Sequence, residues 1–182
     1  MGKILKIFKG EYTMKRIAKF NKVSEEQFKK DWKNTFGDEC SKEWKKFYDR
    51  VTLPERATSG SAGYDFVSPL GFSLAPGESI KIPTGVRARM DEGWVLKLYP
   101  RSGLGFKYRL QLNNTVGIID SDYFNAANEG HIFIKITNDS NEDKTLTINA
   151  GDKIVQGIFI RYGITKDDNA KKIRNGGFGS TD

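Results

Sequence analysis

The chain of 182 residues is short of the residue types that build many active sites, because it contains one cysteine and one histidine. A single cysteine, Cys40, excludes an internal disulfide and a zinc site built from cysteines. The lone His131 argues against a histidine-cluster metal site and against a Ser-His-Asp triad. Any general base is therefore expected to be a carboxylate. The sequence also lacks a long apolar run and a convincing secretory signal, so we expect a cytoplasmic protein with no membrane partner.

Apolar residues are also scarce, at 37% of the chain against 29% charged residues, and the net charge is +7. A basic protein suits phosphate-bearing partners. The lysines nevertheless lie in mixed-sign stretches such as "EEQFKKDWK" (25–33), which are typical of a solvated surface. We therefore expect no specific nucleic-acid binding. A chain of this length can bury a sizeable core, so the low apolar content fits burial of part of its surface by other copies of the chain.

The first residues do not resemble the start of a domain. Met14 opens "MKRIAKF" (14–20), and the tripeptide "KGE" (9–11) before it can be encoded by a purine-rich stretch that resembles a bacterial ribosome-binding site. We therefore expect residues 1–13 to be a translated leader.

Residues 14–53 are expected to form a partly helical N-terminal extension, with helix from 24 to 50. Ser24 and Gln27 have the spacing of a capping box, and Gly37 suits a break between two helices. Aromatic residues four apart share a helix face, which applies to Phe28 with Trp32 and to Trp44 with Tyr48. These aromatics are expected to dock the extension onto the main domain.

After Pro54 the pattern changes to short β-rich runs between turns that contain glycine and proline. The runs are "ESIKIP" (78–83), "WVLKLYP" (94–100), "HIFIKITN" (131–138), "KTLTINA" (144–150) and "KIVQGIFIRYG" (153–163). Short strands at this spacing predict an all-β sandwich or barrel over residues 54–173.

Two fragments carry chemistry of their own. In "YPRSGLGFK" (99–107), Arg101 offers a rigid fork of donors, Ser102 offers a hydroxyl, and Gly103 lets the backbone approach a ligand, which suits phosphate. In "NNTVGIIDSDY" (113–123), Asp120 follows an apolar run and could deprotonate a water. Each fragment also fits an ordinary turn, so neither decides the function alone.

Five fragments in a fixed order are more specific. They are "SAGYDF" (61–66), "PRSGLG" (100–105), "NNTVGIIDSDY" (113–123), "GDKIVQGI" (151–158) and "RNGGFGSTD" (174–182). Together they resemble the five motifs of the homotrimeric, all-β deoxyuridine triphosphatases (dUTPases). The resemblance implies a distorted β-barrel or jelly roll, a flexible C-terminal lid over 174–182, and an extension like that of the longer dUTPases of Gram-positive bacteria and their phages.

The resemblance implies a role for each matched residue. Asp120 matches the catalytic aspartate that activates the attacking water, and Tyr123 matches the aromatic residue that excludes a ribose 2′-hydroxyl. The other matched positions bind substrate: Asn114, Gly117, Ile118 and Ile119 at uracil, Arg101, Ser102, Gly103, Gln156 and Arg174 at the phosphates, and Phe178, Gly179, Ser180 and Thr181 in the lid. Asp65 matches an acid near the phosphates and Mg²⁺. The triphosphate and waters hold most of this ion in the family, so we expect no direct protein ligand.

The reaction implied by the resemblance is hydrolysis of dUTP to dUMP and pyrophosphate, at active sites shared between three copies of the chain. This reaction limits uracil in DNA and supplies dUMP. The sequence departs from the family pattern in "FNAANE" (124–129), which separates Tyr123 from Gly130, and in the terminal Asp182, where glycine is usual and which we expect to point outward.

Three alternatives stay open. A dCTP deaminase shares the fold, but it places a glutamate where this chain has Lys135. A regulatory role with a protein partner, as some phage dUTPases have, is compatible with the motifs. A nucleic-acid-binding β-barrel would need aromatic residues interleaved with basic residues on adjacent strands, and "WVLKLYP" (94–100) offers only a little of this.

Overall fold

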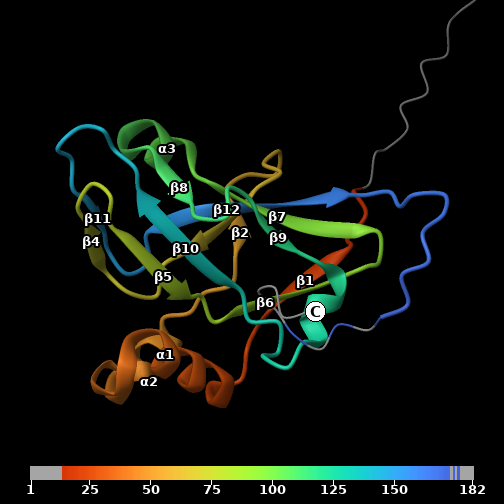
Figure 1. Ribbon diagram of the computed structural model, residues 1–182, viewed down its shortest axis with the longest axis horizontal. Helices are drawn as coiled ribbons and strands as arrows, with labels where there is room; N and C mark the ends of the chain where they lie inside the picture. The colour runs from red at the N-terminus through yellow and green to blue at the C-terminus, as the bar shows by residue number, and fades with distance from the viewer. Residues whose placement is uncertain (1–13, 173, 175, 177–182) are drawn as a thin grey trace, which may run out of the picture.

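The computed structural model describes residues 14–172, 174 and 176, so the expected leader lies outside the described residues. Strands dominate the fold (Figure 1). The helical elements are α1 (Glu25–Cys40), η1 (Ser41–Glu43), α2 (Trp44–Asp49), α3 (Ser102–Tyr108) and η2 (Ser121–Asn125). The strands are β1 (Ala18–Lys22), β2 (Glu55–Arg56), β3 (Tyr64–Val67), β4 (Phe72–Leu74), β5 (Ser79–Pro83), β6 (Val86–Met90), β7 (Trp94–Pro100), β8 (Leu110–Leu112), β9 (Gly117–Ile119), β10 (Phe133–Asn138), β11 (Leu146–Ile148) and β12 (Lys153–Arg161).

The strands form four sheets, all with antiparallel pairing. Their orders are β2-β3-β12-β7-β9, β5-β10-β8, β1-β6 and β11-β4. The expectation of a mostly β fold with a helical N-terminal segment is confirmed. The sheets are arranged in a jelly-roll-like manner, but they do not close into a barrel, because β8 and β9 each end a sheet as an edge strand.

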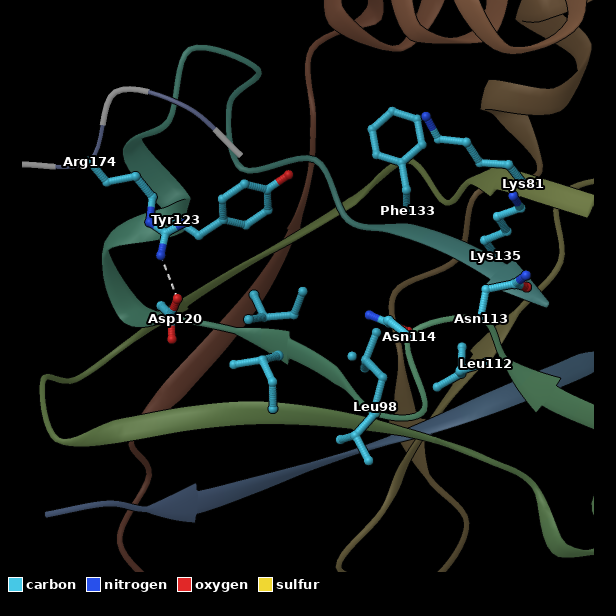
Figure 2. Close-up of a pocket in the computed structure, with 14 residues that line it drawn as sticks. Lys81, Leu98, Leu112, Asn113, Asn114, Asp120, Tyr123, Phe133, Lys135 and Arg174 are labelled. Carbon is cyan, nitrogen blue, oxygen red and sulfur yellow. Dashed lines mark hydrogen bonds and ion pairs between the residues drawn. The ribbon is translucent and has the colours of Figure 1, made fainter. Parts of the chain in front are cut away.

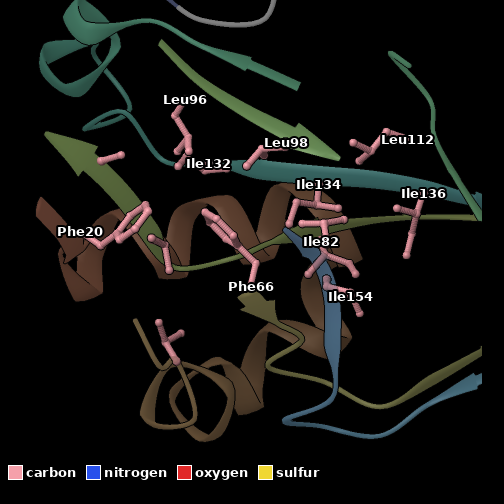
Figure 3. Close-up of a cluster of buried hydrophobic side chains, with 14 of the residues drawn as sticks. Phe20, Phe66, Ile82, Leu96, Leu98, Leu112, Ile132, Ile134, Ile136 and Ile154 are labelled. Atoms are coloured by element: carbon pink, nitrogen blue, oxygen red, sulfur yellow. The ribbon is translucent and has the colours of Figure 1, made fainter. Parts of the chain in front are cut away.

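The core lies between the sheets and takes one face of nearly every strand (Figure 3). In β10 the side chains of Ile134 and Ile136 are buried, whereas that of Lys135 between them is exposed. This alternation places successive side chains on opposite faces of the sheet. The site described below is therefore attached to a rigid, well-packed framework.

The N-terminal segment belongs to the same core. β1 pairs with β6 along its whole length, and its Phe20 makes edge-on contacts with Tyr64 and Phe66. The predicted aromatic pairs share helix faces: the rings of Phe28 and Trp32 stack at 5.3 Å. Both side chains are fully buried, so the helices dock through aromatic packing as expected.

The helix boundaries follow local signals. Ser24 Oγ accepts a hydrogen bond from the Gln27 backbone N–H at 3.1 Å, which is the capping bond. The reciprocal bond of a capping box is absent at this described helix start, because the Ser24 N–H donates to Glu129 instead. Gly37 breaks the helix at φ 83°. No helix in the described part of the chain has the length and apolar character needed to span a membrane.

Candidate active site

A pocket of about 770 Å³ opens between the edge strands β8 and β9 (Figure 2). β8 pairs only with β10, and β9 pairs only with β7, among the described strands. The turn from Asn113 to Val116 joins them, so two edges with unpaired backbone N–H and C=O groups meet at the pocket. Such groups can hydrogen-bond a planar heterocycle that enters between them.

The close packing of β9 on β7 depends on Gly117. A Cβ at this position would lie 3.0 Å from Leu98 Cβ and 3.2 Å from Leu98 Cδ1. The glycine therefore leaves room for the Leu98 side chain of the neighbouring strand β7 beside the β9 backbone at the pocket floor. Asn114 and Ile118 are exposed at the pocket, where a ligand can reach them.

Asp120 lies where β9 ends and η2 begins. Its carboxylate is half exposed and forms an ion pair with Arg174, whose Nη2 lies 2.5 Å from Asp120 Oδ2. Arg174 Nε also binds Asp122 Oδ1 at 2.9 Å. The end of the described chain is thus brought back to the pocket mouth, as the dashed line in Figure 2 shows.

Tyr123 is the buried residue of η2. Its hydroxyl donates to the His131 carbonyl at 2.8 Å and accepts from Asn128 Nδ2 at 2.8 Å. Burial raises the pKa of Tyr123, and the hydrogen bond from Asn128 opposes this only partly. The phenol is therefore neutral, and its ring forms one wall of the pocket.

A second group of predicted residues gathers elsewhere. Asp65 on β3 is nearly buried and binds two cations, with Arg101 Nε at 3.2 Å and Lys153 Nζ at 2.7 Å. Gln156 on β12 is level with Asp65 in the strand register. Ser102 and Gly103 begin α3 directly after Arg101. This cluster can bind an anion, and a hollow of about 540 Å³ lies beside it.

The two groups lie at opposite ends of β7. Ile119 pairs with Leu96, so Asp120 is level with the start of the strand, whereas Arg101 follows its last residue. Between Val95 and Arg101 a strand rises about 3.3 Å per residue, or about 20 Å in all. One chain therefore cannot place Asp120 and Arg101 on the same phosphate.

The structure thus brings together seven of the predicted residues: Asn114, Gly117, Ile118, Ile119, Asp120, Tyr123 and Arg174. It places Asp65, Arg101, Ser102, Gly103 and Gln156 apart from them. The predicted lid residues Phe178, Gly179, Ser180 and Thr181 lie outside the described residues.

Sequence reasoning missed several residues at the two places. Lys81, Phe133 and Lys135 line the pocket, and Lys81 Nζ lies 4.6 Å from the Phe133 ring centroid. Lys153 joins the Asp65 cluster. Of these residues, only Lys135 is singled out by the sequence, as the residue that replaces a deaminase glutamate. The strict alternation of β10 could have identified Phe133 and Lys135 as neighbours on one outer face.

Comparisons with known proteins identify the family of this chain. The family model described as dUTPase matches residues 49–182. The deoxyuridine 5'-triphosphate nucleotidohydrolase of Lactococcus lactis is 43% identical over 134 residues, which is 72% of this chain and 88% of that protein. The enzyme of the same name from Tolumonas auensis is 40% identical, over 71% of this chain and 86% of that protein.

Solved structures extend the similarity. The dUTPase of Streptococcus mutans superposes with a TM-score of 0.56 at 40% identity, covering 65% of this chain and 91% of that one. The dUTPase of Staphylococcus bacteriophage 80alpha superposes with a TM-score of 0.60 at 22% identity, over 92% of this chain and 99% of that one. The superposition with the phage enzyme covers a larger share of this chain than residues 54–182 make up. It therefore includes part of the N-terminal segment. The chain belongs to the dUTPase family.

Proposed function

We propose that this protein hydrolyses dUTP to dUMP and pyrophosphate. The observation that carries the proposal is the pocket between two strand edges that ends at Asp120, in a chain of the dUTPase family. The relatives from Lactococcus lactis and Tolumonas auensis are named for this reaction. The product would supply dUMP, and removal of dUTP would limit uracil in DNA.

In the proposed mechanism Asp120 is the general base. Its carboxylate, which is half exposed at the pocket mouth, would hold a water and take its proton while the water attacks the α-phosphorus in line. General-base catalysis contributes typically about 10²–10⁴-fold. Arg174 neutralises Asp120 in the described chain. Substrate phosphates would attract the guanidinium away and free the carboxylate for the water.

Specificity for the base would come from the strand edges. Asn113, Thr115 and Val116 already donate their backbone N–H groups within the chain, so the remaining backbone groups of the two strand edges would have to match the donor and acceptor pattern of uracil. Cytosine reverses part of that pattern. A methyl group is worth only about 1–3 kcal/mol in a snug pocket, so exclusion of thymine must come from a steric clash with the pocket wall. Tyr123 would exclude ribose in the same way, because its buried ring cannot move aside easily.

The phosphates would bind at Arg101, Ser102, Gly103 and Gln156, with Asp65 orienting Arg101. Mg²⁺ would arrive with the triphosphate and neutralise charge on it, and charge stabilisation is a large contribution in phosphoryl transfer. Both oxygens of Asp65 face cations, and the described residues hold no group of three or more side chains suited to binding a metal. As the family resemblance implies, the ion would depend mainly on phosphate oxygens and waters. A dUTPase mutant from phage phi11 of S. aureus, a structural neighbour of this chain, coordinates a structural Mg(II) ion.

The separation of about 20 Å along β7 supports sites shared between copies of the chain, and the family resemblance supports a homotrimer. Asp120 of one copy would meet Arg101 of a neighbouring copy, and the lid, residues 174–182, would close over the nucleotide. In this proposal residues 54–173 form the catalytic domain and residues 14–53 form its extension.

A deaminase would need a carboxylate where Lys135 lines the pocket, and lysine cannot perform that role. A regulatory protein partner is a second proposal. It is motivated by the phage dUTPases, such as that of Staphylococcus bacteriophage 80alpha, which control transfer of virulence genes. Affinity capture with an inactive Asp120 variant would test it independently of catalysis.

The decisive experiment is pyrophosphate release from dUTP, dTTP, dCTP and UTP, with and without Mg²⁺. We expect dUTP to be strongly preferred and Mg²⁺ to be required for full activity. Asp120→Asn should lower kcat by about 10²-fold or more, while dUMP binding is largely kept. Asp122→Asn is a matched control, because it also loses a bond to Arg174 but leaves the base intact. Comparable turnover of dCTP, or ammonia release, would overturn the proposal.

A further inference from the structure

We infer that the N-terminal segment positions Tyr123 through the loop of residues 121–131, and that Glu129 is the residue that couples them. The extension would then set the discrimination between deoxyribose and ribose, although it does not reach the nucleotide. This inference rests on the proposed function, since it names residues that tune the specificity of the same pocket.

The loop is closed tightly on itself around Tyr123. Gly130 has φ +68°, and a Cβ there would lie 2.5 Å from the Tyr123 carbonyl oxygen and 2.7 Å from Phe124 Cα. The Tyr123 hydroxyl binds the His131 carbonyl and Asn128, both of which belong to the loop. The position of the Tyr123 ring therefore follows the position of residues 128–131.

Glu129 fastens this part of the loop to the start of α1. Its two carboxylate oxygens accept from Ser24, at 2.8 Å from the backbone N–H and 2.6 Å from Oγ. These bonds replace the reciprocal half of the capping box, so helix α1 and the loop share one junction. Burial raises the pKa of Glu129, but the bonds from Ser24 and the charge of Arg87 outweigh this and lower it, so the carboxylate is ionised.

Contacts from β6, from α1 and from Gly85 also hold the same loop from outside. Arg87 on β6, which pairs with β1, donates to the Phe124 carbonyl, and its guanidinium carbon lies 3.6 Å from the Phe124 ring centroid. His131 is fully buried, and its Nδ1 lies 2.6 Å from Asp31 Oδ2 on α1. His131 Nε2 accepts from the Gly85 N–H at 2.8 Å, so Nδ1 carries the proton that Asp31 accepts.

Every one of these anchors lies outside the pocket. Glu129, Ser24 and Asp31 are absent from the described residues that line it. A change in sugar selectivity on their substitution would therefore reach the pocket indirectly, through Tyr123 or through Phe133, whose ring centroid lies 4.7 Å from that of His131. The double-mutant cycle described below distinguishes these two routes. The segment "FNAANE" (124–129), which sets this chain apart from the usual motif, supplies both Glu129 and Asn128, so the inserted residues and the extension form one supporting unit.

The test compares kcat/KM for dUTP and UTP in Glu129→Ala, Glu129→Gln and the parent protein. Glu129 has φ +58°, and alanine keeps the same backbone constraint, so the substitution removes mainly the carboxylate. We expect Glu129→Ala to raise the UTP-to-dUTP ratio by about tenfold, equivalent to about 1.4 kcal/mol. Glu129→Gln keeps one acceptor for Ser24 Oγ, so its UTP-to-dUTP ratio should lie between those of the parent protein and Glu129→Ala.

Lys45→Ala is the matched control, because it breaks ion pairs of the same helices, to Glu25 and Asp49, without touching the loop. The UTP-to-dUTP ratio of kcat/KM in Lys45→Ala should equal that of the parent protein. A double-mutant cycle with Tyr123→Ala identifies the route: Glu129→Ala should have no further effect on the ratio once the ring is gone. Calorimetric binding of dUMP and UMP gives the same comparison without turnover.

The outcomes separate the two proposals. If the parent protein does not hydrolyse dUTP, the proposed function fails. If it does, but the ratio is unchanged in Glu129→Ala at equal folded fraction, or changes equally in Lys45→Ala, the positioning role is refuted. An effect that persists fully in the Tyr123→Ala background would also refute it.

Discussion

The separation of Asp120 from Arg101 predicts that two inactive variants restore activity to each other. Asp120→Asn lacks the base, and Arg101→Ala lacks a phosphate ligand. If one site takes Asp120 from one copy and Arg101 from the next, a mixed trimer can contain a site with both residues intact. A site built within one chain could never be restored in this way.

The size of the recovery follows from cyclic symmetry. The three copies of a mixed trimer form a ring and contain either one or two copies of each variant. In both compositions, one direction around the ring has a single position at which an Arg101→Ala copy is followed by an Asp120→Asn copy. Each mixed trimer therefore has one complete site, and purified mixed trimers should show about one third of the parent activity. The homotrimers of each variant should stay near background.

The assay uses co-expression with two different affinity tags and tandem purification, followed by pyrophosphate release from dUTP. Two controls are needed: homotrimers carried through the same steps, and mixed trimers in which both substitutions lie on one chain and the partner is Asp120→Asn. The latter has no chain with an intact Asp120 and should remain inactive. Mixed trimers no more active than either homotrimer would refute the reasoning from the strand register.

The remaining predictions concern the sugar, the lid and acid stability. Tyr123→Ala should raise UTP hydrolysis relative to dUTP, and an unchanged ratio would mean that the ring does not contact the sugar. Deletion of residues 174–182 should leave the melting temperature similar but lower kcat by orders of magnitude, because Arg174 and the lid are lost; full activity would disprove the lid. Burial lowers the pKa of His131, and the charge of Asp31 opposes this only partly. The unfolded chain then binds a proton at His131 that the native chain does not bind. The free energy of unfolding should therefore fall as the pH drops below about 6.5. A melting curve series from pH 7.5 to 5 should show this fall, and it should be smaller in His131→Gln.

Local signals predicted most of the fold. The run "WVLKLYP" coincides with β7 (Trp94–Pro100), and "KIVQGIFIRYG" contains β12 (Lys153–Arg161). Both have β-branched and aromatic residues bounded by turn residues, and both signals depend on neighbours in the sequence. Gly37 broke the helix as expected, because only glycine adopts its backbone angles readily.

Long-range pairing was beyond such reasoning. The pairing of β1 with β6 joins segments far apart in the sequence, and no pattern in "AKFNK" indicates its partner. The capping box failed for the same reason: Gln27 has the right spacing, but its amide donates to the buried Asp31 at 2.7 Å, and Glu129 takes its place. The fold supplies an ionised carboxylate from a distant part of the chain, and a carboxylate is a stronger acceptor than the neutral amide oxygen of Gln27.

The sequence predicted which residues belong to the candidate site, but it did not predict how they are arranged in space. Motif order identified Asp65, Arg101 and Asp120 together, but β7 keeps Arg101 and Asp120 at opposite ends. The proposed shared sites would also account for the apolar side chains that are exposed at both ends of β7. Ile118 is 51% exposed on the free edge of β9, and Phe106 is 90% exposed on α3, which follows Arg101. Exposed strand edges and large apolar side chains promote association. In the proposed homotrimer a neighbouring copy would supply the missing half of each site, and the same contact would cover these surfaces, so assembly and catalysis would depend on one interface.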